Sequence, residues 1–284
     1  MRKLVQAGVV TLLVLIGGSL LVAFILRARH TANRIACHNN LRQIGVALHN
    51  YHDTKGRLPS GTKPADVLAP EQRLSWQFEL VPYIEAWMDP AWQRAHKSSR
   101  WDIEENRQVV SMPIRIYLCP SNANQATPGS PGLAHYVGVA GVGEDAALLP
   151  RDDARAGVFG YENCPGQHSW ASMGVRMEDI KDGLTSTMMV VETTWQNGPW
   201  AAGGPATVRG LDPERQPYLG ENCQFGGLHR AAAAESSWFS HPQVTNILFA
   251  DASVRFVTSA IEPRIFEAMA TIAGGEEIGE IGDN

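Results

Sequence analysis

The sequence predicts an α+β protein in which a long N-terminal transmembrane and stalk helix packs on an antiparallel β-sheet body. Three observations predict this class: an uncharged, mostly apolar run over residues 4–26, helical spacing of apolar residues up to residue 53, and short β-rich runs later in the chain. The 284 residues, 44% of them hydrophobic, suffice for a substantial core.

Residues 4–26 predict a membrane anchor. As a helix they rise about 35 Å, which exceeds the roughly 30 Å of a bilayer's hydrocarbon core. A cleavable signal peptide is the alternative, but its apolar region normally has about 7–15 residues and precedes a small-residue cleavage site. Here the run ends in Arg27 and Arg29. We therefore expect a retained, single-pass signal anchor, with residues 1–3 in the cytoplasm.

Charge is distributed unevenly along the chain. The first acidic residue is Asp53, and after residue 34 the acidic side chains outnumber the basic ones by about ten. Nucleic acid is excluded as a partner because phosphate binding needs a basic face. Basic residues flank both ends of the apolar run, so charge does not set its orientation. The four cysteines and the large C-terminal part favour an extracytoplasmic body on the cytoplasmic (inner) membrane.

Residues 27–54 predict an amphipathic stalk helix that continues the anchor and ends near Gly56. Its apolar stripe is Leu41, Ile44, Leu48 and Tyr51. Polar side chains that include two histidines share another face: His38, Arg42, His49 and Asp53. Two of these groups could hold a metal, but without a His-Glu-x-x-His pattern we expect structural or solvated histidines.

The remaining elements are short. Residues 75–87 predict a helix that contains Pro82, and Asp102 with Glu105 predicts a capping box for a helix ending near residue 111. Strands are predicted over residues 114–118, 136–140, 187–193, 246–250 and 254–257, the last two joined as a hairpin at residues 251–253. A final helix is expected between Pro263 and Gly274, loops over residues 120–135 and 196–224, and a solvated acidic tail over residues 275–284.

Several segments resemble one family. The first are residues 37–53 (CHNNLRQIGVALHNYHD) and 58–61 (LPSG). The others are Ser75-Trp76, residues 80–85 (LVPYIE), 117–121 (YLCPS), 136–141 (YVGVAG), 157–160 (GVFG), 180–183 (IKDG), 190–192 (VVE) and 273–276 (AGGE), and His241 followed after nine residues by Asp251. Together they resemble the bacterial prepilin-like family of unknown function, domain of unknown function 1559, over residues 35–280.

This resemblance implies a type IV pilin-like fold and no established reaction. The chain departs from the family at two points. It lacks the Phe-Thr-Leu-Ile-Glu start of a mature pilin helix, and Ala252 stands where the His-x9-Asp-Gly signature has glycine. A tight hairpin that needs a positive φ at this position would cost alanine about 1 kcal/mol, unless the turn differs.

The four cysteines, Cys37, Cys119, Cys164 and Cys223, allow three pairings. We prefer Cys37–Cys119, which would join the stalk helix to the body, together with Cys164–Cys223 between loops. Zinc ligation is the alternative, although no pair shows the close spacing of metal ligands.

His241 and Asp251, the two signature residues, flank a predicted strand. With Glu192 they could form a hydrolase site or share a metal, but no nucleophile accompanies them. They could equally tie the hairpin, because an aspartate in a turn accepts backbone N–H groups. We favour this structural interpretation.

Trp195 and Trp200 lie in a Gly- and Pro-rich region, where exposed indoles could stack on a ligand. We prefer the alternative that they pack the core beneath loops. Overall we expect a membrane-anchored, pseudopilin-like protein with a structural or interaction role, no enzyme activity and no cofactor. Its expected partners are the lipid bilayer, through residues 4–26, and other pilin-like or envelope proteins. An anchored solute- or glycan-binding module is the alternative function.

Overall fold

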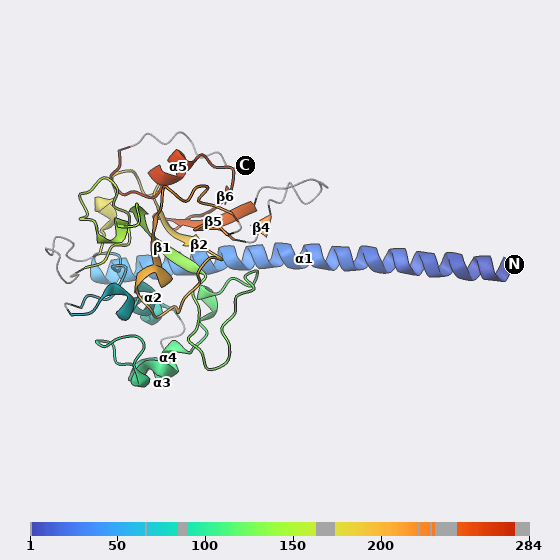
Figure 1. Cartoon of the computed structure of the whole chain (residues 1–284), viewed down its shortest axis with the longest axis horizontal. Helices are drawn as coiled ribbons and strands as arrows, with labels where there is room; N and C mark the ends of the chain where they lie inside the picture. Colours follow the sequence, from blue (N-terminus) through green and yellow to red (C-terminus); the bar gives the residue numbers. More distant parts are fainter. Residues whose placement is uncertain are drawn as a thin grey trace.

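The computed structural model describes residues 2–65, 67–84, 90–162, 174–220, 222–227, 229–230 and 243–275. The fold is α+β, as predicted: a long N-terminal helix runs along a β-sheet body and projects well beyond it (Figure 1). Of the acidic tail predicted over residues 275–284, only Gly275 belongs to the described part of the chain.

Helix α1 spans Arg2–Lys55 without a break, so the predicted anchor and stalk are one continuous helix. No proline interrupts its 54 residues. Large apolar side chains between Val9 and Leu26 are exposed, whereas Cys37 is the first fully buried residue. By length and composition this helix is apolar enough either to cross a membrane or to serve as a signal sequence.

The described residues form a six-stranded, mostly antiparallel sheet, in which only β1 and β3 pair in parallel. Its strands are β1 (Tyr136–Val142), β2 (Met188–Glu192), β3 (Val208–Leu211), β4 (His229–Arg230), β5 (Gln243–Phe249) and β6 (Val254–Thr258). β6 pairs with one edge of β5. β2 and β4 follow each other along the other edge, because Val191 pairs with Ile247 and His229 pairs with Val244.

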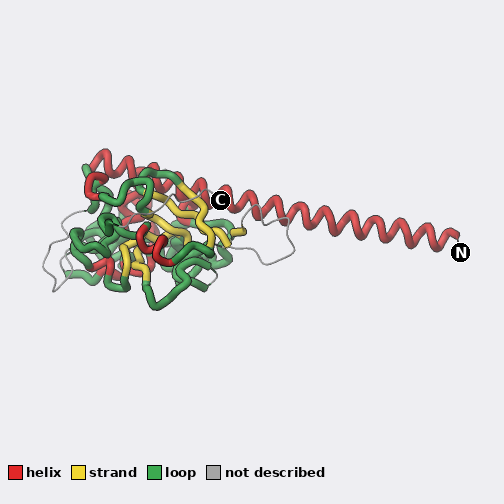
Figure 2. Tube along the Cα trace, turned by 90° about the horizontal axis from the view of Figure 1, so that it is seen from above, coloured by secondary structure: helices red, strands yellow, loops and turns green. Residues whose placement is uncertain are grey.

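The sheet buries side chains on both faces. On one face the apolar stripe of α1 packs against the sheet; a Cβ added at Gly45 would lie only 2.8 Å from Leu248, so the helix and strand are in close contact. On the other face Phe266 of α5 (Pro263–Ala268) belongs to a second cluster with Val139 and Ile247. Figure 2 shows the strands beside the body half of α1.

The other helices are short. They are α2 (Trp76–Leu80), α3 (Pro90–Arg94) and α4 (Arg107–Val110), with single 3₁₀ turns at Pro70–Gln72, Val81–Tyr83, Glu104–Asn106, Arg115–Tyr117, Ala146–Leu148, Met177–Asp179 and Gly204–Ala206. The helix predicted over residues 75–87 is therefore α2 followed by a 3₁₀ turn at Pro82, and its residues 85–87 lie outside the described part. α5 ends at Ala268, six residues before Gly274.

Three local predictions are wrong. Where a strand was predicted over residues 114–118, Arg115–Tyr117 form a 3₁₀ turn, which buries Tyr117 so that its hydroxyl donates to the Gln77 carbonyl oxygen. Asp102 caps no helix because both of its carboxylate oxygens accept from Arg100. The expected loop over residues 196–224 contains β3, whose backbone pairs with β1 despite the surrounding glycines.

The predicted β5–β6 hairpin is confirmed. The Asp251 carboxylate accepts from the Ser253 backbone N–H at 2.9 Å, as expected for an aspartate in a turn. Ala252 has φ +64°. Alanine therefore occupies the left-handed conformation that glycine adopts at no cost, and this strain costs about 1 kcal/mol.

Candidate functional site

The Cys37–Cys119 disulfide, which the sequence analysis preferred, joins α1 to the segment after the Arg115–Tyr117 turn. Its Cα atoms are 5.1 Å apart and both residues are buried. The Cys119 backbone N–H donates to His135 Nδ1 at 2.9 Å. Burial lowers the pKa of His135, which favours a neutral ring whose Nε2–H donates to the Asn124 carbonyl oxygen.

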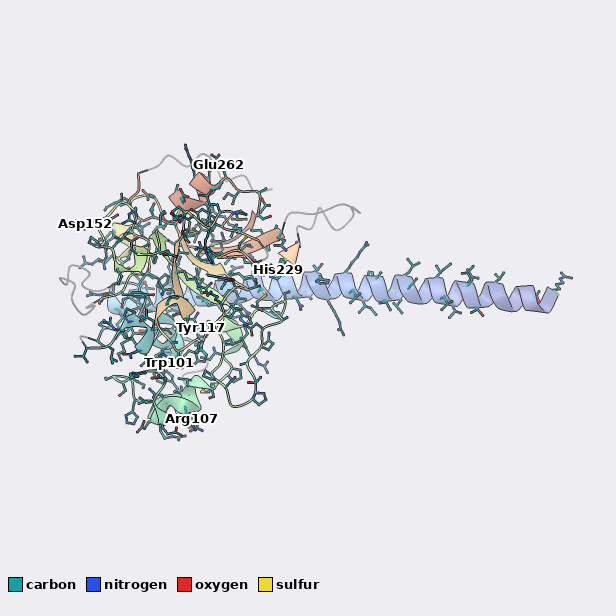
Figure 3. All side chains as sticks on the ribbon, in the orientation of Figure 1. Trp101, Arg107, Tyr117, Asp152, His229 and Glu262 are labelled. Carbon is teal, nitrogen blue, oxygen red and sulfur yellow. A yellow bond between two sulfur atoms is a disulfide. The ribbon has the colours of Figure 1, made fainter. Side chains whose placement is uncertain are left out.

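A buried carboxylate–imidazole pair lies directly beside this disulfide. Glu192 is the last residue of β2 and His229 the first of β4, and both strands follow the same edge of β5. The His229 Nε2–H donates to Glu192 Oε1 at 3.0 Å, and the same nitrogen lies 3.7 Å from Cys119 Sγ. The two side chains are only 1% and 2% exposed for Glu192 and His229 respectively. Figure 3 shows His229 beside α1, near the point where this helix leaves the body.

Neighbouring groups fit the carboxylate closely. Asn246 of β5 donates to Glu192 Oε2 at 2.9 Å, so each carboxylate oxygen has a hydrogen-bond donor. A Cβ added at Gly227 would lie 2.4 Å from Oε2, so only glycine leaves room for the carboxylate. Burial, and then the nearby charge of Glu192, raises the pKa of the Tyr136 phenol well above its usual value. The pair is thus held in a closed, polar enclosure.

The tryptophans predicted as possible stacking residues lie in different environments. Trp200 is fully buried, its Nε1–H donates to the Met112 carbonyl oxygen, and its ring stacks on Phe78. The prediction that Trp200 stacks on a ligand is therefore wrong, because its ring and its Nε1–H already contact residues of the core. Trp195 is half-buried beneath the guanidinium groups of Arg209 and Arg215, at 5.3 and 5.0 Å from its ring centre.

Among the other predicted residues, only those in the described part of the chain can be placed. His241 and Cys164 lie outside the described residues, so neither the signature pair nor the Cys164–Cys223 disulfide can be placed. Asp251 holds the hairpin turn and contacts Arg255 at 3.9 Å. Glu192, which the sequence analysis joined with these two residues, pairs with His229 instead.

The polar face of α1 confirms the structural interpretation of its histidines. His38 stacks on Phe256, and burial, followed by the charge of Arg42, lowers its pKa. His49 Nε2 lies 3.0 Å from the Ala250 carbonyl oxygen. The helix therefore uses both histidines to contact the β5–β6 hairpin.

His229 is the functional candidate that sequence reasoning missed. It lies in a Gly-Gly-Leu-His run before a two-residue strand, which gives no periodic signal. Glu192 gave the one usable indication of a site here. It lies at the end of a predicted apolar strand, and a carboxylate that is buried there needs a hydrogen-bonding partner.

Comparisons with known proteins give one match. The model of the family described as "Protein of unknown function (DUF1559)" matches residues 27–264, which include the disulfide and the Glu192–His229 pair. No curated protein and no solved structure matches. The matched region covers most of the chain and agrees with the resemblance seen in the sequence, and the chain therefore belongs to the DUF1559 family of proteins of unknown function.

Proposed function

We propose that this protein is a single-pass membrane protein that displays its body outside the cytoplasmic membrane, where it has a structural or interaction role. One observation carries the proposal: α1 exposes its apolar side chains up to Leu26 and buries its stripe only from Cys37 onward. About ten residues, or roughly 15 Å of helix, separate these two regions. Arg27, Arg29 and Arg34 lie in this interval, where lipid headgroups would meet them.

The disulfide supports the outer location, because such bonds persist in oxidising compartments and are rare in the cytosol. The burial of the Glu192–His229 pair supports a role other than catalysis. Glu192 and His229 are sealed from solvent, so a substrate has no route to them in this conformation.

A charged anchor tests the membrane assignment. We expect the wild-type protein to resist alkaline carbonate extraction, and the Leu13→Arg/Leu20→Arg variant to move largely to the soluble fraction. Each arginine at mid-span costs about 2.5–3.5 kcal/mol. Val46→Arg/Val67→Arg is the matched control, because it places the same charges at exposed apolar positions of the body and should stay in the membrane.

Protease added to spheroplasts tests the orientation in the same experiment. It should digest the body and leave the anchor. Protection of the body would overturn the extracytoplasmic location, and a wild-type chain that lacks residues 1–26 would identify a cleaved signal peptide instead.

For the interaction role we propose a partner, the helix of a neighbouring pilin-like envelope protein. An open groove of about 1180 Å³ lies between α1 and residues 112–116, and the exposed Val46 lines it. Because α1 runs straight from this groove toward the membrane, a neighbour anchored beside it would bring its own helix along the groove (Figure 1).

A photo-reactive amino acid at Val46 tests this surface in native membranes. We expect a cross-linked adduct that contains a second pilin-like chain, identified by mass spectrometry. The same group at Val67, which is 86% exposed on a loop, serves as the control. Equal adducts at both positions, or none at Val46, would contradict the proposed partner.

A further inference from the structure

Four potential metal ligands meet at the candidate site, each from a different element. Cys37 comes from α1, Cys119 from the segment after the Arg115–Tyr117 turn, Glu192 from β2 and His229 from β4. One ligand atom from each, namely the two Sγ atoms, a carboxylate oxygen and an imidazole nitrogen, lies within 4.8 Å of all the others. All four residues are buried. All four residues belong to the body, so this site does not depend on whether residues 4–26 cross a membrane.

The donor set suits one class of ion. Two sulfurs, an imidazole nitrogen and a carboxylate oxygen are ligands of zinc, which prefers tetrahedral sites. With metal–ligand distances of about 2.0–2.3 Å, tetrahedral ligands lie about 3.3–3.8 Å apart. His229 Nε2 lies 3.7 Å from Cys119 Sγ and 3.0 Å from Glu192 Oε1. Two of the donor–donor distances are therefore already close to those that such a site requires, and the others stay within 4.8 Å.

The surroundings would orient the ligands. Asn246 holds the second carboxylate oxygen, so Glu192 can present Oε1 alone. His135 fixes the Cys119 backbone N–H at 2.9 Å, and Gly227 leaves the space that the carboxylate occupies. Outer partners of this kind typically determine metal affinity by about 10–100-fold.

We propose that Cys37, Cys119, Glu192 and His229 bind a zinc-like divalent cation when the disulfide is reduced, and release it when the disulfide forms. A dithiol reductant would convert the S–S bond into two thiols and become a disulfide itself. Binding would then displace the two thiol protons, and the imidazole would shift its single proton from Nε2, where it faces Glu192, to Nδ1, so that Nε2 becomes a metal ligand. Either the metal or the disulfide would thus connect α1 to the body.

Cobalt titration of the full-length protein in detergent tests this proposal. After anaerobic reduction with a phosphine, we expect one Co²⁺ per chain, with thiolate-to-cobalt charge-transfer absorption of two thiolates and the visible bands of a tetrahedral site. Zinc should bleach both signals, and the oxidised protein should show neither. This measurement needs no variant, so it stands even where a substitution prevents folding. Absence of the charge-transfer band from the reduced protein would overturn the proposal.

Variants then locate the site. We expect His229→Ala to weaken cobalt binding by more than about 100-fold and Asn246→Ala by about 10–100-fold, because the latter removes only an outer partner. Cys223→Ser is the matched control, since it removes a described cysteine outside the cluster and should bind as the wild type does. Equal binding by the Cys37→Ser/Cys119→Ser variant would show that the metal lies elsewhere.

Discussion

Replacing Cys37 and Cys119 together by serine is expected to lower the free energy of unfolding by about 4.5 kcal/mol. The bridge joins residues 82 positions apart, and closing so long a loop removes much of the entropy of the unfolded chain. Because domains are stable by only about 5–15 kcal/mol, this loss would leave the body marginally folded.

Urea unfolding of the detergent-solubilised protein, followed by tryptophan fluorescence, measures this effect. Val67→Ser, at a position 86% exposed on a loop, is the control for an added serine hydroxyl and should unfold near the wild-type midpoint. A loss below about 1 kcal/mol for the double variant would show that the bridge contributes little. Adding zinc to the reduced wild type should restore much of the lost stability, since an ion that binds only the folded state stabilises it.

His229→Leu is expected to cost about 3–5 kcal/mol, because it leaves the buried Glu192 carboxylate without one of its two donors. The Glu192→Leu/His229→Leu double variant should regain most of this loss, since no unpaired charge remains. His49→Leu is a matched control: its Nε2 also lies 3.0 Å from an oxygen, but this oxygen is a carbonyl and the site is only partly buried. It should cost about 1 kcal/mol.

Unfolding free energies of the wild type, both single variants and the double variant complete a double-mutant cycle. Coupling of at least about 2 kcal/mol would demonstrate that Glu192 and His229 stabilise the fold as a pair. Additive losses would instead show that each side chain contributes only its own packing.

The sequence predicted most reliably what repeats regularly along the chain. The spacing of Leu41, Ile44 and Leu48 predicted both the helix and its buried face, and all three side chains are fully buried. Strands β1, β2, β5 and β6 carry enough β-branched residues to be recognised, and Asp251 marked their hairpin. The Cys37–Cys119 pairing was also chosen correctly among three.

Features that depend on tertiary contacts were not predictable. The β-rich residues 114–118 turn because Tyr117 enters the core, and Arg100 takes the carboxylate that was expected to cap a helix. His229 reaches Glu192 only because two short strands share one edge of β5. No periodicity within either segment encodes that register.

The unbroken α1 also has a mechanical consequence. A helix without a hinge acts as a lever, so any tilt of its apolar N-terminal half is transmitted undiminished to its far end at Lys55. Membrane helices tilt by about 20° on average, which over the roughly 80 Å of α1 displaces that end sideways by about 27 Å. For the proposed membrane-spanning α1, the thickness of the bilayer would set this tilt and would therefore determine where the body points.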